Sequence, residues 1–233
     1  MSVDVPIRQI GFVLFPGMTQ LDLTGPWEVL TRLPDTRCHL LAHDLAPVQS
    51  ASGGLSIVPS MPFSECGQLD IVVVPGGPGH LDAMQDERIL AFLRRQESGC
   101  QFMMAICTGT LILAAAGLLQ GYECTTHWTA LHRLSAFGAK PVSRRVVFDR
   151  TRATGGGVTA GIDLGLVLAS RLAGEDVARK IQLQMEYVPE PPFAGSPMTA
   201  DPAIVDALRD PPPAIAKLIR EIDAAAIAKL SRE

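Results

Sequence analysis

The chain has 233 residues, of which 47% are hydrophobic and 19% charged, and its formal net charge is −4. This length allows one large domain with a substantial core, or two small ones. The acidic balance provides no basic field for nucleic acid or an anionic membrane surface, and the apolar runs are too short or too broken to span a bilayer.

Strand-like and helix-like segments alternate over the first 188 residues. The expected strands are short apolar runs at residues 10–15, 38–44, 54–60, 70–77 and 101–106, followed by a strand pair around 144–155. The expected helices have apolar residues at helical spacing, at residues 21–33, 86–99, 110–119, 125–138, 158–174 and 176–188. This alternation predicts an α/β sandwich with a mostly parallel central sheet and helices on both faces.

The last part of the chain differs from this pattern. It begins with the Pro-rich stretch VPEPPFAGSPMTADP, which cannot form a regular helix. Residues 203–210 and 214–230 are expected to be helices, separated by three prolines at 211–213. We therefore expect an α/β domain over residues 1–200 and a C-terminal helical arm over residues 201–233, packed on its own domain or on a second subunit.

The cysteines indicate a reducing compartment. They are odd in number and widely scattered, and they show no CxxC or Cys/His spacing typical of zinc; they are Cys38, Cys66, Cys100, Cys107 and Cys124. The N-terminal residues lack a basic region and a small-residue cleavage site, so we expect no cleaved leader. We expect a cytoplasmic protein without a metal site.

Candidate chemistry lies where expected strands end, because ligands of open α/β sheets bind outside the carboxyl ends of the strands. In QFMMAICTGTLILAAAGLL, Cys107 stands between a strand and a helix, as in a nucleophile elbow. A helix beginning near Thr108 would direct N–H groups and its positive end at the sulfur, which favours the thiolate. Since free cysteines are often core residues, the residues alone leave a buried structural Cys107 equally open.

Two glycines follow the expected strand of DIVVVPGG. Gly76 and Gly77 allow close approach of the backbone to a ligand, and the amides of Gly77 and Thr108 would form a pair of the oxyanion-hole type. A plain Gly-Pro turn is the alternative.

An acid and a histidine complete the set of candidates. Asp22, between two leucines after the first strand, is either a helix N-cap or a buried carboxyl with a raised pKa that would serve Cys107 as a general acid. His127 is interpreted as a packing partner of Trp128. Because no histidine follows position 132, a Cys-His-acid triad is not expected.

Five stretches, in this order, carry a family resemblance: FPGMTQLDLTGPWEVL, DIVVVPGGPG, AICTGTLILAAAGLLQG, TTHW and TGGGVTAGIDLGL. Over about residues 7–200 the chain resembles the ThiJ/PfpI superfamily of class I glutamine amidotransferase-like proteins, and within it the isonitrile (isocyanide) hydratases. The resemblance implies a flavodoxin-like α/β sandwich, usually a homodimer, with a nucleophilic cysteine at an elbow.

The resemblance also implies roles for individual residues. Cys107 matches the nucleophile, Asp22 the acid, Thr108 a residue whose hydroxyl and amide assist, and Gly77 the second backbone donor. In such hydratases a thiolate attacks the terminal carbon of an isocyanide, and a thioimidate is hydrated to an N-substituted formamide without a metal or organic cofactor. The implied partners are this small-molecule substrate and a second copy of the chain, with no nucleic acid and no membrane.

Other functions remain open from the sequence. Glyoxalase-like or deglycase-like enzymes of the same superfamily resemble the chain at the elbow, but they usually have glutamate in place of Asp22. Transcription regulators of the AraC type often carry a similar module ahead of helix-turn-helix units, so a non-catalytic small-molecule sensor is a further alternative. Only about 45 residues follow position 188, with no basic recognition helix, so DNA binding is not expected.

Overall fold

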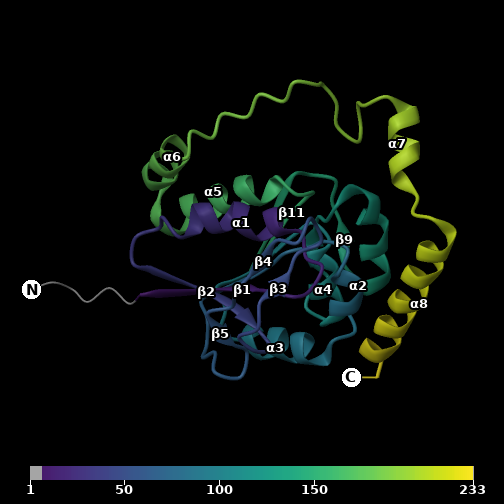
Figure 1. Cartoon of the computed structure of the whole chain (residues 1–233), viewed down its shortest axis with the longest axis horizontal. Helices are drawn as coiled ribbons and strands as arrows, with labels where there is room; N and C mark the ends of the chain where they lie inside the picture. Colours follow the sequence, from purple (N-terminus) through teal and green to yellow (C-terminus); the bar gives the residue numbers. More distant parts are fainter. Residues whose placement is uncertain (1–6, 233) are drawn as a thin grey trace, which may run out of the picture.

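The protein is described by a computed structural model that covers residues 7–232. Its centre is a seven-stranded sheet with the strand order β10-β11-β7-β6-β1-β2-β5 (Figure 1). Neighbouring strands are parallel, except that β10 runs antiparallel to β11. The strands of this sheet are β1 (Arg8–Val13), β2 (Thr36–Ala42), β5 (Met61–Pro62), β6 (Ile71–Val74), β7 (Phe102–Ile106), β10 (Val146–Asp149) and β11 (Arg152–Gly155).

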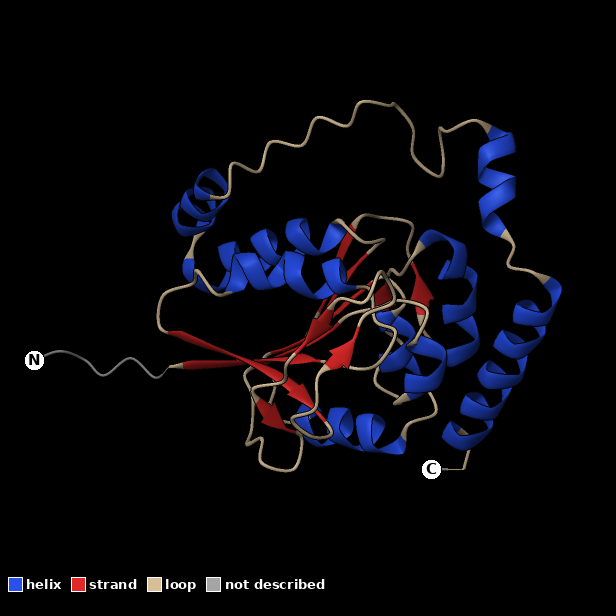
Figure 2. Ribbon diagram, viewed as in Figure 1, coloured by secondary structure: helices blue, strands red, loops and turns tan. Residues whose placement is uncertain are grey.

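Helices cover both faces of the sheet (Figure 2). On one face α1 (Gln20–Leu30) packs against α5 (Ala160–Ala173), followed by α6 (Glu175–Gln184); on the other lie α3 (Glu87–Glu97) and α4 (Gly109–Ala115). The short helix α2 (His80–Ala83) precedes α3 and contacts α4. The α/β sandwich with a mostly parallel sheet, expected from the sequence, is thus confirmed.

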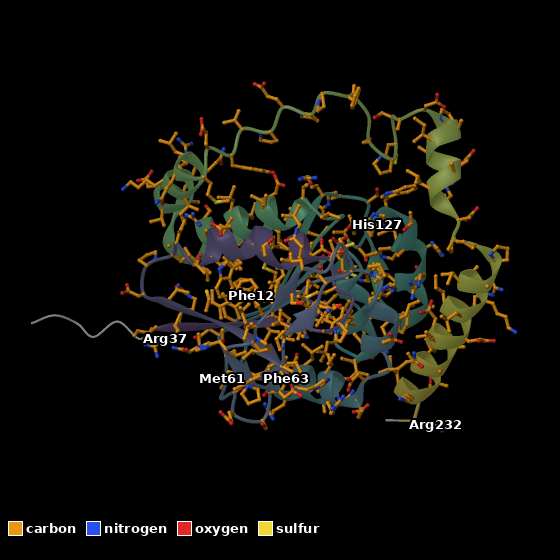
Figure 3. The ribbon with its side chains drawn as sticks, viewed as in Figure 1. Phe12, Arg37, Met61, Phe63, His127 and Arg232 are labelled. Carbon is orange, nitrogen blue, oxygen red and sulfur yellow. The ribbon has the colours of Figure 1, made fainter. Side chains whose placement is uncertain are left out.

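The core lies between the sheet and these helices. All four residues of β6 are buried, as their β-branched run predicts for a strand covered on both faces. Phe12, labelled in the interior of Figure 3, packs edge-on against Trp27 of α1 with ring centroids 5.0 Å apart. Small residues let α1 approach α5 closely: a Cβ at Gly25 would lie 3.1 Å from Ile162 Cγ1. Helices α1 and α5 therefore pack tightly together on this face of the sheet.

Two expected elements differ in kind from the prediction. Within the helix expected at residues 125–138, the structure has a 3-10 helix, η1 (Trp128–Phe137), and His127 stands at its N-cap without a side-chain capping bond. The expected strand at 54–60 reduces to β4 (Ser56–Ile57), which forms a small antiparallel pair with β3 (Val48–Gln49) outside the main sheet. A second small pair joins β8 (Glu123–Cys124) and β9 (Lys140–Pro141).

The C-terminal arm contains α7 (Pro202–Arg209) and α8 (Pro213–Leu230), which an extended segment connects to α6 (Figure 1). The prolines exclude regular helix from this segment, as expected. Helix α8 packs against α4 and buries Ile222 and Ala226. Within residues 7–232, no helix has the length and apolar character that a membrane crossing requires.

Candidate active site

The three expected site segments converge because β1, β6 and β7 are adjacent and parallel. The loop after β1 leads into α1, the loop after β6 carries the two glycines, and the turn after β7 carries the cysteine. Their carboxyl ends therefore meet at one edge of the sheet, where α/β proteins bind ligands.

Cys107 forms a strained turn between β7 and α4. Its φ is +54°, a left-handed conformation that is uncommon for residues other than glycine, and its residue is 6% exposed. Its N–H donates to the carbonyl oxygens of Gly155 and Gly156, both at 3.0 Å, and the Thr126 hydroxyl donates to its carbonyl at 2.6 Å. This backbone geometry is that of a nucleophile elbow.

The carboxyl of Asp22 lies in α1 against the Cys107 thiol and is fully buried. Its Oδ2 accepts a hydrogen bond from the Gly76 N–H at 3.0 Å, whereas its Oδ1 has no hydrogen-bond partner among the described residues. Burial raises the pKa of Asp22 from 3.8 to about 7, against the opposing effect of the Gly76 and Cys107 hydrogen bonds. Asp22 therefore carries a proton near neutral pH far more readily than an exposed carboxyl, and it does not cap α1.

The resting thiol differs from the sequence-based prediction. Burial, and then the nearby Asp22 carboxylate, raise the pKa of Cys107 to about 12, although the Thr108 amide and hydroxyl act in the opposite direction. The start of α4 alone therefore does not produce a free thiolate. Because each negative charge disfavours the other, simultaneous ionisation of the two buried groups is strongly disfavoured.

The glycine amides have partners within the protein. Gly76 N–H donates to Asp22, and Gly77 N–H donates to Thr108 Oγ1 at 2.9 Å. A Cβ at Gly76 would lie 2.5 Å from Thr108 N, so a side chain there would collide with the elbow. The structure thus brings Cys107, Asp22, Thr108, Gly76 and Gly77 into one cluster.

His127 contacts Trp128 and not the reacting groups. Its ring centroid is 5.9 Å from that of Trp128, and its Nδ1 lies 2.8 Å from Thr129 Oγ1. Figure 3 shows His127 beside η1. In the part of the chain that the structure describes, no histidine is among the groups that shift the pKa of Cys107.

Sequence reasoning missed a second buried polar group beside the glycine turn. His80 Nδ1 lies 2.8 Å from the Gly77 carbonyl oxygen, and its Nε2 lies 3.1 Å from Arg133 Nη1. Arg133 in turn forms a two-point ion pair with Asp223 of α8, at 2.7 and 2.9 Å. The position of His80 directly after PGGPG was a usable signal, whereas nothing in the sequence connects Arg133 with Asp223.

A cavity of about 870 Å³ lies between η1 and the C-terminal arm, and Thr108, His80 and Arg133 contribute to its wall. Its apolar lining includes Trp128, Leu131, Leu208 and Ile219. The cysteine elbow therefore adjoins a large, partly apolar space. Within residues 7–232, no group of three or more potential metal ligands of the His, Cys, Asp or Glu type is present.

Comparison with known proteins agrees with this geometry. Isonitrile hydratase of Pseudomonas putida is 50% identical over 224 residues, which cover 96% of this chain and 98% of that protein. The crystal structure of a ThiJ/PfpI family protein from Pseudomonas syringae superposes with a TM-score of 0.87 at 40% identity, covering 96% and 93% of the two chains. The helix-turn-helix transcriptional regulator GbdR of Pseudomonas aeruginosa is 34% identical over 77% of this chain, which spans 51% of the regulator.

The profile of the DJ-1/PfpI family matches residues 8–171. This match includes β1 to β11 and every residue of the cysteine cluster, and the arm of α7 and α8 lies beyond it. The chain belongs to the DJ-1/PfpI family.

Proposed function

We propose that this protein is an isonitrile hydratase, which converts a small-molecule isocyanide into an N-substituted formamide with Cys107 as nucleophile. The observation that carries the proposal is the buried carboxyl of Asp22 against the elbow thiol, with its Oδ1 unpartnered among the described residues. The near full-length similarity to the isonitrile hydratase of P. putida supports the same reaction.

The first step uses the proton that Asp22 and Cys107 share. The thiol gives its proton to the carboxylate, and the resulting thiolate attacks the terminal carbon of the isocyanide to form a C–S bond. The electron pair that develops on this carbon takes the proton back from Asp22, which leaves a neutral thioimidate. The raised pKa of Asp22, about 7, matches a group that accepts and returns a proton near neutral pH.

The second step consumes water. Addition of water across the C=N bond of the thioimidate yields a tetrahedral carbon that carries nitrogen, hydroxyl and sulfur. Collapse of this intermediate breaks the C–S bond, returns the thiol and releases the formamide. The net reaction therefore joins one isocyanide and one water into one formamide. Asp22, a buried carboxyl beside Cys107, takes the proton from that water and delivers one to nitrogen.

The remaining residues hold these two groups in place. The Thr108 amide and hydroxyl stabilise negative charge on the Cys107 sulfur, and Gly76 orients Asp22 through its N–H. A direct contact between the Gly77 N–H and substrate stays a prediction, and it requires the Thr108 hydroxyl to release that amide.

Assays with two substrates separate this proposal from its rivals. Purified protein is incubated with an alkyl isocyanide and, in parallel, with methylglyoxal. Conversion of the isocyanide to its formamide supports the proposal. Turnover of methylglyoxal alone favours a glyoxalase. Binding without turnover of either compound favours a sensor, the alternative suggested by the similarity to GbdR.

A further inference from the structure

The buried polar group beside the glycine turn is not used by the mechanism above. His80 and Arg133 are each 7% exposed, and both side chains lie between α2, η1 and α8. They connect Asp223 in the C-terminal arm with the Gly77 carbonyl, and therefore with the turn that contacts the cysteine. Figure 1 shows α8 beside α2 and α4, on this side of the molecule.

The two neighbours of His80 determine which of its ring nitrogens carries the proton. The guanidinium of Arg133 has donors only, so Nε2 must accept from it. The proton is therefore on Nδ1, which donates to the Gly77 carbonyl at 2.8 Å. Burial, and then the charge of Arg133, lower the pKa of His80 to about 4, and a neutral ring with this tautomer is the result.

More hydrogen-bond donors lie near the Gly77 carbonyl oxygen than its two lone pairs can accept from. The His80 ring and the His80 backbone N–H lie at 2.8 and 3.0 Å, and the Thr108 hydroxyl lies farther away, at 3.2 Å. A carbonyl oxygen has two lone pairs, and the two closer donors occupy them. Thr108 Oγ1 already accepts from the Gly77 N–H, so its own proton needs another acceptor.

We propose that His80 is a positioning residue. Its ring and its backbone N–H occupy both lone pairs of the Gly77 carbonyl oxygen, so the Thr108 hydroxyl directs its proton toward the Cys107 sulfur. Arg133 fixes the tautomer that this requires, and Asp223 fixes Arg133. The C-terminal helix α8 thereby stabilises the charged nucleophile without touching it. The consequence for turnover rests on the proposed hydratase function, but the effect on the thiol does not.

Two substitutions of His80 separate its two contacts. Asn places a side-chain N–H where the ring has Nδ1, so His80→Asn keeps the donor to Gly77 and loses the acceptor for Arg133. Gln reaches the position of Nε2, so His80→Gln keeps the acceptor for Arg133 and loses the donor to Gly77. The rate of Cys107 alkylation by iodoacetamide, measured from pH 6 to 10 on folded full-length protein, reports how readily the thiolate forms.

We expect His80→Gln to move the alkylation profile to higher pH and to slow the reaction at neutral pH by about ten-fold, the effect of losing one hydrogen bond to a charged group. His80→Asn should stay within about three-fold of the unchanged protein. Equal profiles for all three proteins, or equal shifts in both variants, would overturn the proposal.

The substitution Thr108→Val provides a second test, which remains decisive if one His80 variant does not fold. Because His80 acts through the Thr108 hydroxyl, Thr108→Val should itself slow alkylation, and adding either His80 substitution should cause no further change. Additive effects in the double variants contradict the proposal. Since no isocyanide is present, these results stand even if the hydratase assay is negative.

Discussion

Two acidic groups of the protein, Asp223 and Asp22, have opposite surroundings. Asp223 of α8 meets the Arg133 guanidinium at two points, and the two side chains are 15% and 6% exposed. Asp22 of α1 is fully buried, receives one backbone N–H and faces a thiol whose ionised form would repel it. The first carboxylate is neutralised by its partner, whereas the second is not.

This difference distinguishes a structural pair from a reactive one. A buried charge with a well-placed partner keeps one protonation state, so it can hold two helices in a fixed relation. A buried carboxyl without a cation exchanges its proton near neutral pH, which acid-base chemistry requires.

The largest effect is expected at the nucleophile. Cys107→Ala should lower isocyanide turnover by about 10⁴-fold or more, since no other group can form the C–S bond. Cys38→Ser, a substitution of a free cysteine in β2, is the matched control and should keep turnover within about two-fold. Formamide formation followed by mass spectrometry measures both, and substantial turnover by Cys107→Ala would rule out covalent catalysis here.

Removal of the proton carrier should follow in magnitude. Asp22→Asn keeps the shape of the side chain but cannot exchange a proton, so turnover should fall by about 10²- to 10⁴-fold. Steady-state rates for this variant are compared with those of Glu221→Gln, in which an exposed pair with Lys217 is altered. An Asp22→Asn enzyme with ordinary rates would show that the acid is supplied elsewhere.

The pH dependence of the free energy of unfolding should show that Asp22 is a buried carboxyl with a raised pKa. Its pKa is about 7 in the folded chain against 3.8 as a free side chain, so the native state binds the proton more tightly. The free energy of unfolding should therefore fall between pH 4 and pH 7, by on the order of 4 kcal/mol from this group. Asp22→Asn should lack that fall. Urea titrations of the unchanged protein and of Asp22→Asn at pH 4.5 and 7.5 give the change in the free energy of unfolding of each. Equal changes in the two proteins would contradict a raised pKa of Asp22.

Loss of the Arg133–Asp223 pair should lower the stability of the fold. Asp223→Ala leaves the Arg133 guanidinium buried without its partner, which should cost about 3 kcal/mol of unfolding free energy. Glu221→Ala alters an exposed residue of α8 two positions before Asp223, so it should change the free energy of unfolding by less than about 0.5 kcal/mol. Thermal or urea unfolding distinguishes the two, and similar small losses would mean that α8 contributes little to the fold.

Sequence reasoning predicted the local structure around Cys107. The alternation of apolar strands and amphipathic helices was enough for the α/β sandwich, and the strand-turn-helix at Cys107 was visible from its flanking runs. The sequence did not show that the helix after His127 is a 3-10 helix. The spacing of apolar residues does not distinguish a short 3-10 helix from an α-helix.

By itself, then, the sequence determined which residue types stand at strand ends, since strand and helix periods are local properties of the chain. Only the tertiary structure decided that the order β7-β6-β1 brings Asp22 to Cys107 across 85 positions, and that burial raises the pKa of both groups. The tertiary structure also decided that the Gly76 and Gly77 amides donate to Asp22 and Thr108. It connects α8 to the glycine turn through Arg133 and His80. Desolvation and hydrogen-bond competition depend on what surrounds a group in space, which the spacing of residues along the chain does not contain.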